Sequence, residues 1–340
     1  MTPPKVSVLS LGGTIAMASE GGSGVVPTLT GDDLISAVPQ LGDVGEVTAY
    51  SFRQVPGAHI RIEDLAQTAA EIARLTGEGS DGIVITQGTD TIEETAFVLD
   101  LLADTEAPLV VTGAMRNPTL PGADGPANLL ASVQVAASSA ARGLGALVVF
   151  NDEIHAARHV RKIRTQNPAA FSSFPVGPVG WVAEGKSRIA LRVPRTPGLQ
   201  IPEVASAKAV ALVTVALGDD GSLLSAVERS GYAGLVVEAM GGGHVPAVMV
   251  EALASLADKM PVILASRTGG GEILRHTYGF PGSEIDLLDR GLIPAGPLDG
   301  PKARLLLTLL LMSGIAGEDI FAAFDRWITA IFAYNNDQYC

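Results

Sequence analysis

The chain has 340 residues, more than one average domain, and carries 23 Lys and Arg against 36 Asp and Glu, a net charge of −13. Charged residues make up only 17% and hydrophobic residues 47%, whereas roughly 25% of an ordinary soluble chain is charged. This composition excludes disorder and predicts a large core. The negative charge and the 5% aromatic content argue against a nucleic-acid-binding protein, so we expect a small polar substrate.

Membrane, secretion and metal signals are missing from the sequence. The most apolar stretch, 305–316, is shorter than the roughly 18 residues of a transmembrane span, and residues 1–5 do not open a signal peptide. The single cysteine, Cys340, allows no intrachain disulfide and no cysteine metal cluster, and the five histidines have no metal-ligand spacing. We expect a cytoplasmic protein without membrane contact, metal or cofactor.

Apolar runs and helix-like segments alternate from the N-terminus onward. The runs cover 6–11, 82–86, 109–112 and 146–150, and each ends in glycine or a small polar residue. This alternation predicts a mostly parallel sheet with helices on both faces. Because ligands gather beyond the carboxyl ends of parallel strands, the polar residues that follow these runs are candidates for one common site.

Two helices are predicted between these strands. Residues 91–94, Thr-Ile-Glu-Glu, have capping-box spacing before an apolar run, and the alanine-rich segment 125–141 has few breakers. Thr89 and Asp90 then fall in the turn between a strand and a helix N-terminus. Free backbone N–H groups there favour negative charge.

The pattern lapses between Ile189 and Pro202, where three prolines and a glycine follow in close succession, and it resumes in a smaller α/β region. Strands are expected at 210–217, 234–237 and 262–265, and helices at 248–257 and from Pro301 onward. We therefore predict an N-terminal domain over 1–188, a linker over 189–206 and a C-terminal domain over 207–340. The fold class is α/β, with two α/β domains.

Three short segments carry candidate chemistry. Gly12-Gly13-Thr14 presents a hydroxyl at a strand end and continues into a glycine-rich stretch typical of a mobile lid, without the spacing of a dinucleotide fingerprint. Thr89-Asp90 places a hydroxyl beside a carboxylate, which suits either helix capping or a substrate amine. Lys162 lies in a basic patch and is either a solvated charge or the base partner of a hydroxyl.

Together these residues resemble the bacterial-type L-asparaginase (asparaginase/glutaminase) family along almost the whole chain. The two signatures are Leu-Gly-Gly-Thr-Ile-Ala at 11–16 and Ile-Thr-Gln-Gly-Thr-Asp-Thr-Ile-Glu-Glu-Thr-Ala at 85–96. Supporting segments lie at 37–41, 112–116, 123–129, 149–152, 162–165 and 302–306.

The resemblance implies the roles of individual residues. Thr14 would be the nucleophile that forms an acyl-enzyme, and Lys162 would tune the hydroxyl of Thr89, while Asp90 would hold the substrate amine. The backbone carbonyl of Ala114 would contact the scissile amide. The remaining residues of the implied substrate-binding set are Gly57, Ala58, His59 and Gly88.

The resemblance also implies a homotetramer of intimate dimers, in which each site is closed by a neighbouring subunit. His244, which follows three glycines, and Tyr278 and Glu284 are the candidates for that neighbour's contribution.

Four positions depart from the family pattern. Gly24 stands where a lid tyrosine is common, Ala58 replaces a serine that contacts the substrate carboxylate, the family's asparagine falls near His244, and Gln87 replaces a histidine. Because alanine donates no hydrogen bond, the substrate carboxylate needs another partner, for which His59, backbone N–H groups, Tyr278 and Glu284 are candidates. We expect weaker binding of asparagine or a shifted substrate.

The sequence therefore predicts an amidohydrolase that converts L-asparagine to L-aspartate and ammonia, with glutamine as a poorer substrate. One alternative is a related amidase that acts on another amide, which Ala58 and Gly24 motivate. Another is a non-catalytic amino-acid-binding protein, which would have no need of the set Thr14, Thr89, Asp90 and Lys162.

Overall fold

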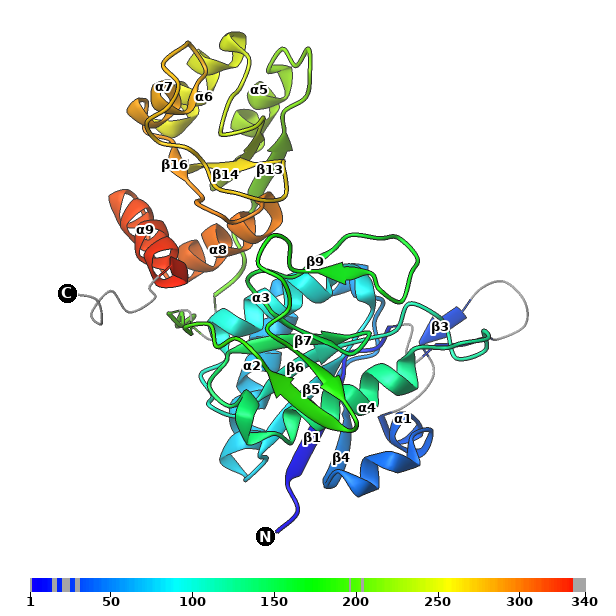
Figure 1. Cartoon of the computed structure of the whole chain (residues 1–340). Helices are drawn as coiled ribbons and strands as arrows, with labels where there is room; N and C mark the ends of the chain where they lie inside the picture. The colour runs from blue at the N-terminus through cyan, green and yellow to red at the C-terminus, as the bar shows by residue number, and fades with distance from the viewer. Residues whose placement is uncertain are drawn as a thin grey trace, which may run out of the picture. The chain divides into compact units, whose positions relative to one another are not determined.

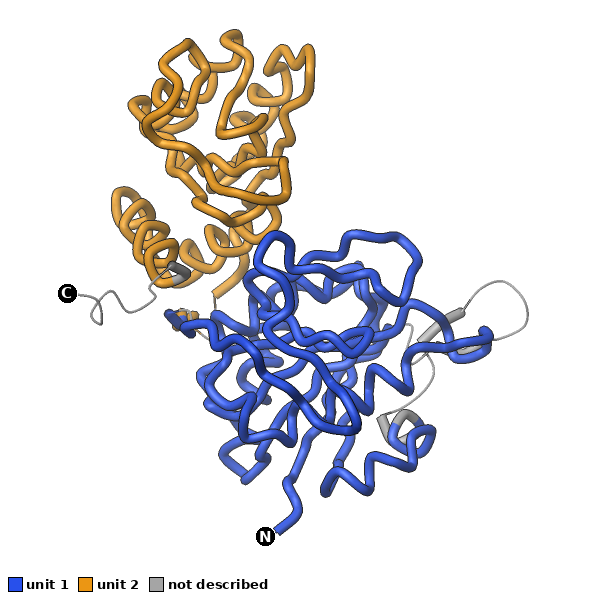
Figure 2. Tube along the Cα trace, in the orientation of Figure 1, with its two compact units in different colours: residues 1–198 blue, residues 199–340 orange. Residues whose placement is uncertain are grey.

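The computed structural model describes residues 2–13, 17–19, 25–27, 31–195, 197–202 and 205–332. The chain divides into two compact units, 1–198 and 199–340 (Figure 2).

An eight-stranded sheet forms the centre of unit 1 (Figure 1). Its parallel strands are β4 (Glu46–Ser51), β1 (Lys5–Ser10), β5 (Gly82–Thr86), β6 (Leu109–Thr112) and β7 (Ala146–Phe150), in that spatial order. The antiparallel strands β8 (Glu153–Ala156), β11 (Gly180–Ala183) and β12 (Lys186–Ile189) extend the sheet beyond β7. The predicted mostly parallel sheet is confirmed. The central parallel strands could be predicted because a strand that is buried on both faces appears in the sequence as a continuous apolar run.

Helices cover this sheet (Figure 1). They are α2 (Ile62–Gly77), α3 (Ile92–Leu102) and α4 (Gly125–Ala136). The α4 helix contacts β5, β6 and β7 and shares a core with alternate residues of the strands, such as Val84, Val110 and Leu147, which point to one face. The expected helix over 125–141 is shorter than predicted, because the chain turns after Ala136 and Ser139–Ala141 forms a separate 3₁₀ turn.

Short elements complete unit 1. They are β2 (Met17–Ser19), β3 (Val25–Pro27), β9 (Arg161–Lys162), β10 (Phe171–Ser172), α1 (Gly31–Ser36) and the 3₁₀ turns Pro39–Asp43, Gly57–His59 and Thr89–Thr91. Strand β9 pairs antiparallel with β10, and β2 pairs antiparallel with β3.

Unit 2 is a smaller α/β unit with a wholly parallel four-stranded sheet. Its strands are β13 (Val210–Thr214), β14 (Gly234–Ala239), β15 (Val262–Ser266) and β16 (Ile293–Pro294), and its helices are α5 (Ser222–Arg229), α6 (Val250–Ala257), α7 (Glu284–Asp289), α8 (Gly300–Met312) and α9 (Glu318–Phe332). A 3₁₀ turn, Ala247–Met249, precedes α6. Each strand and helix expected after residue 207 is present, with ends that differ by a few residues.

Helix α8 is almost wholly buried, as its apolar sequence predicts. Its N-terminus is capped by Asp299, whose carboxylate accepts hydrogen bonds from the backbone N–H of Lys302 at 2.9 Å and from its ammonium at 3.0 Å. Lys302 is 1% exposed, so this buried cation has its charge balanced where the helix begins.

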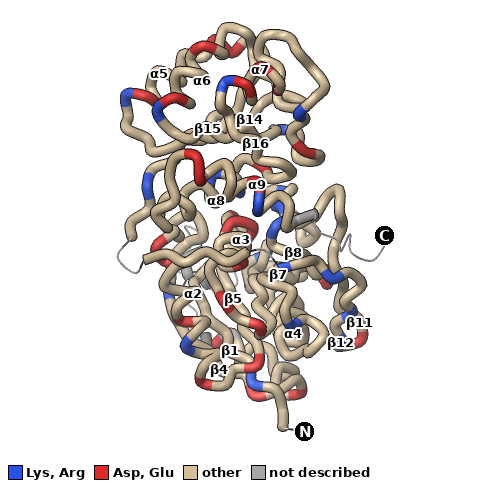
Figure 3. Tube along the Cα trace, turned by 90° about the vertical axis from the view of Figure 1, so that its left-hand side faces the viewer, with Lys and Arg blue, Asp and Glu red and all other residues tan. Residues whose placement is uncertain are grey.

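Charged residues of both signs are interspersed along each unit rather than gathered in one block (Figure 3). Across the part of the chain that the structure describes, no helix has both the length and the apolarity needed to cross a bilayer.

Candidate active site

The turn after β5 carries the first two site residues. Gly88 is extended, and Thr89–Thr91 then form a 3₁₀ turn that runs directly into α3. Thr89 and Asp90 therefore lie between a strand and a helix N-terminus, as predicted. Thr89 is 7% exposed, whereas the side chain of Asp90 is 71% exposed, so that an ammonium group can reach its carboxylate from solvent.

The predicted capping box at Thr91 is wrong. The Thr91 hydroxyl donates to the Gly57 carbonyl at 2.9 Å and accepts from the Gln87 amide at 3.1 Å, with no bond to the backbone of α3. Because the chain enters α3 from a 3₁₀ turn, Thr91 lacks the extended conformation of an N-cap residue. Its hydroxyl instead joins the loop after β4 to the loop after β5.

Three glycines let the loops after β1, β4 and β5 approach one another. A Cβ atom on Gly13 would lie 1.9 Å from the Gly88 nitrogen, and one on Gly57 would lie 2.9 Å from the Gly88 oxygen. Gly13 also has φ +86°, a conformation that L side chains rarely adopt. Backbone thus packs on backbone at the carboxyl edge of the sheet, where no larger residue fits.

Lys162 reaches this edge from β9. Its ammonium donates to the Thr89 hydroxyl oxygen at 2.9 Å and to the Asp90 carboxylate at 2.8 Å. Its side chain is 15% exposed, and its backbone N–H donates to the carboxylate of Glu93 in the first turn of α3. The lysine is therefore fixed at both ends, and its charge is directed at a hydroxyl and a carboxylate.

These groups line a cavity of about 450 Å³. Its lining residues are Pro56, Gly57, Ala58, Gly88, Thr89, Asp90, Met115, Lys162, Thr165 and Gln166. Six of the residues expected in the site are thus brought together from loops that are far apart in the sequence.

The other residues of unit 1 that were expected in the site either do not line this cavity or are not among the described residues. His59 follows Ala58 but is exposed and does not line the cavity. Ala114 is 1% exposed and immediately precedes Met115, which does line it. Thr14 and Gly24 lie outside the described residues.

The three candidates for a neighbour's contribution form one cluster in unit 2. The His244 ring nitrogen Nε2 lies 3.2 Å from the Glu284 carboxylate, and the rings of His244 and Tyr278 stack edge to face at 4.9 Å. Glu284 is fully buried and accepts the backbone N–H groups of Thr277 and Tyr278 at 2.9 and 2.7 Å. Burial favours its neutral form, but these hydrogen bonds and the one to His244 outweigh burial and lower the pKa of Glu284.

Several functional neighbours were not predicted from the sequence. Pro56, Met115 and Gln166 line the cavity, and Glu93 holds the Lys162 backbone. Met115 and Glu93 lie inside the segments that carry the family resemblance, which is the only signal that singles them out. Gln166 belongs to a loop without periodicity.

Comparisons with known proteins show the family of this chain. Residues 5–195 match the family described as "Asparaginase, N-terminal", and residues 209–324 match the "Glutaminase/Asparaginase C-terminal domain". The chain is 36% identical over 329 residues to a probable L-asparaginase of Deinococcus radiodurans, covering 96% of this chain and 98% of the other. It is 34% identical over 312 residues to an L-asparaginase of Bacillus licheniformis, covering 91% and 96%.

A solved structure is also similar over almost the whole chain. A probable cytoplasmic L-asparaginase from Campylobacter jejuni superposes with a TM-score of 0.86 at 31% identity, covering 94% of this chain and 99% of that one. In an α/β protein, a lysine that donates a hydrogen bond to a buried threonine hydroxyl beside a cavity at the strand ends is an arrangement that suits a hydrolase. The chain belongs to the asparaginase family, whose members are amidohydrolases.

Proposed function

We propose that this chain hydrolyses L-asparagine to L-aspartate and ammonia through an acyl-enzyme, with glutamine as a poorer substrate. The observation that carries the proposal is the position of the Lys162 ammonium, 2.9 Å from the Thr89 hydroxyl and 2.8 Å from the Asp90 carboxylate. A binding protein would need the carboxylate for an amine, but it has no need of a cation on a neighbouring buried hydroxyl.

The proposed mechanism divides the work between two threonines. Thr14 attacks the side-chain amide carbon, and the Ala114 carbonyl orients the amide nitrogen. The Lys162 ammonium donates to the Thr89 oxygen, so the Thr89 proton is free for transfer and negative charge on that oxygen is stabilised. Gly13, the residue before Thr14, packs against Gly88, which supports a site shared by both loops.

Asp90 is proposed to hold the α-amino group of the substrate. Its carboxylate has room for further hydrogen bonds beside the one from Lys162, because an ionised carboxylate offers about four acceptor positions. Its exposed side chain leaves those positions open to a substrate ammonium.

We further propose a homotetramer built from intimate dimers, in which His244, Tyr278 and Glu284 of one subunit complete the site of another. The exposure of Tyr278, 44%, beside the fully buried Glu284 supports a cluster that can meet a partner. A cytoplasmic location is proposed from the likeness to the Campylobacter jejuni protein, which is described as probably cytoplasmic.

Ammonia release from a panel of amides tests this function. L-asparagine should be the best substrate among asparagine, glutamine, D-asparagine and capped amides, and Thr14→Ala should abolish its turnover while the circular dichroism spectrum is kept. Preferential cleavage of a capped amide would favour an amidase for another substrate. Binding of asparagine without any ammonia release would favour the amino-acid-binding alternative.

A matched pair of variants tests the missing hydroxyl at Ala58. This residue lines the cavity but donates no hydrogen bond from its side chain. A hydrogen bond to a charged group contributes about 1.5–3 kcal/mol, so Ala58→Ser should lower KM for L-asparagine about ten- to hundredfold. Steady-state kinetics should show no such change for Ala169→Ser, an exposed position outside the cavity. An unchanged KM in Ala58→Ser would mean that the carboxylate binds elsewhere.

A further inference from the structure

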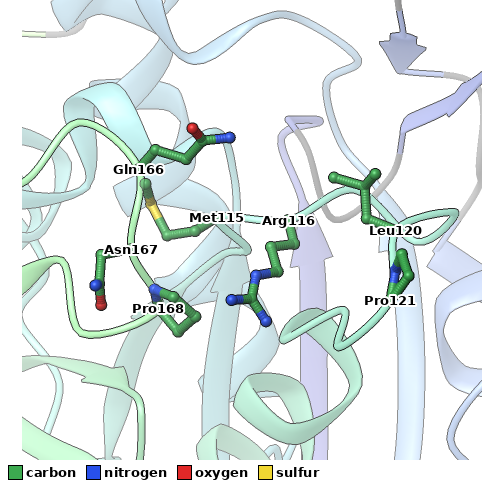
Figure 4. Close-up of a pocket in the computed structure, with 7 residues that line it drawn as sticks. All are labelled: Met115, Arg116, Leu120, Pro121, Gln166, Asn167 and Pro168. Atoms are coloured by element: carbon green, nitrogen blue, oxygen red, sulfur yellow. The ribbon is translucent and has the colours of Figure 1, made fainter.

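A second cavity adjoins the first one in unit 1. It has a volume of about 380 Å³ and is lined by Met115, Arg116, Leu120, Pro121, Gln166, Asn167 and Pro168 (Figure 4). Met115 and Gln166 also line the cavity of Thr89 and Lys162. The two cavities therefore share part of their wall.

Among the described residues that line this second cavity, Arg116 alone has a charged side chain. Its backbone is fixed, because the N–H groups of Met115 and Arg116 donate to the two carboxylate oxygens of Asp124 at 3.0 and 2.8 Å. Its guanidinium donates to the Gly122 carbonyl at 2.9 Å and pairs with no carboxylate of the described residues. A guanidinium has five N–H donors, so most of its capacity remains for a ligand.

Part of the wall around this cation is apolar, and Gln166 and Asn167 supply amide groups beside it. Leu120, Pro121 and Pro168 supply hydrocarbon surface, and Leu120 is 44% exposed. An arginine at an apolar wall fits a carboxylate carried beside an apolar group, since the planar guanidinium binds carboxylates with two parallel hydrogen bonds.

The first cavity offers fewer partners for a ligand carboxylate. The charge of Lys162 is already matched by Asp90 at 2.8 Å, and Ala58 brings no hydroxyl. Of the two side-chain cations that line these adjoining cavities, the Lys162 ammonium is paired with Asp90, whereas the Arg116 guanidinium is paired with no carboxylate of the described residues.

We propose that the Arg116 cavity receives the amine half of a substituted amide, and that the enzyme also hydrolyses β-aspartyl amino acids with an apolar side chain, such as β-aspartyl-leucine. This inference rests on the proposed function, in which Ala114 orients the amide nitrogen. The next residue, Met115, lines both cavities, so a substituent on that nitrogen passes over Met115 toward Arg116.

The chemistry is that of the parent reaction with a larger leaving group. The amide C–N bond breaks as the threonine oxygen bonds to the acyl carbon, and the departing nitrogen takes up a proton and leaves as leucine. Water then cleaves the acyl-enzyme to aspartate. Nothing beyond water is consumed.

Kinetics with two substrates and three variants test the inference. The wild-type enzyme should hydrolyse both L-asparagine and β-aspartyl-leucine. In Arg116→Gln, the ratio of kcat/KM for β-aspartyl-leucine to that for asparagine should fall about ten- to hundredfold, the effect of losing a charge-assisted hydrogen bond. Arg116→Lys should recover part of this ratio. Arg142→Gln makes the same charge change at an exposed position away from both cavities and should leave the ratio unchanged.

A third substrate isolates the carboxylate. In β-aspartyl-leucinamide the leucine carboxylate is replaced by an uncharged amide. The wild type should have a lower kcat/KM for this compound than for β-aspartyl-leucine, whereas Arg116→Gln should have similar kcat/KM values for both. Thermal unfolding shows whether Arg116→Gln is folded. If it is not, Leu120→Asp at the exposed rim should lower the same ratio, because the new carboxylate repels the leucine carboxylate of the substrate.

The outcomes separate this inference from the proposed function. Hydrolysis of asparagine without hydrolysis of β-aspartyl-leucine overturns the inference and leaves the proposed function intact. An equal loss on both substrates in Arg116→Gln also overturns it, because Arg116 would then support the fold of the loop alone. Failure to hydrolyse either substrate overturns the proposed function together with the inference.

Discussion

Replacing Lys162 by methionine is expected to lower kcat for L-asparagine by about 10²- to 10⁴-fold, the range for loss of a group that assists proton transfer. The ammonium donates to Thr89 at 2.9 Å, and without it no charge stabilises the Thr89 oxygen when its proton leaves. Methionine has a similar length and no charge, so the packing of β9 should be kept. Steady-state ammonia release measures the effect, with Lys186→Met at an exposed position of β12 as the control.

Because Lys162 bonds Thr89, a double variant of these two residues gives a further test of this prediction. Thr89→Val should cause a loss of similar size, and the double variant should be scarcely slower than either single variant, because each change disables the same unit. Losses that multiply in the double variant would show that the two residues act independently. Retention of most of kcat in Lys162→Met would remove the lysine from the reaction.

The central strands of the sheet that lead into the site were predictable because they are buried on both faces. β5, β6 and β7 were expected at the residues where they occur, since a central parallel strand leaves an uninterrupted apolar run with a polar residue at its end. The same reasoning placed Thr89 and Asp90 in the turn before α3. The antiparallel strands β8, β11 and β12 were not expected, because they are short and partly polar and lie at or near the edge of the sheet.

Local sequence patterns could not predict that Lys162 lies next to Thr89. The two residues are 73 positions apart, and β9 has only two residues, too few for any periodicity. The family resemblance alone joined them. The Arg116 cavity is likewise formed by two loops, after β6 and after β9. Glu93 bonds the backbone of Lys162, and Asp124 bonds the backbones of Met115 and Arg116.

Thr91 shows that a sequence pattern can predict a local hydrogen bond that the folded chain does not form. Its spacing to Glu94 is that of a capping box, yet its hydroxyl bonds Gly57 and Gln87 instead. A hydroxyl bonds whichever partner tertiary packing brings nearest. Here the loop after β4 is brought within reach by the glycine contacts, which no local rule includes.

Those glycine contacts lead to the largest expected effect on stability. Gly13→Ala should destabilise the folded chain by on the order of 3–5 kcal/mol, because the new Cβ would lie 1.9 Å from the Gly88 nitrogen and the residue has φ +86°. The loops after β1 and β5 would have to separate, so ammonia release from any folded fraction should fall as well. The midpoint of urea unfolding measures the first effect.

Gly79→Ala is the matched control for that change. Gly79 has φ +101° but nothing within 4 Å of an added Cβ, so it carries the backbone strain without the clash, about 1–2 kcal/mol. The difference between the two variants therefore measures the contact of Gly13 with Gly88. Equal destabilisation would mean that the two loops can move apart at little cost, and that the geometry of the cavity does not depend on their contact.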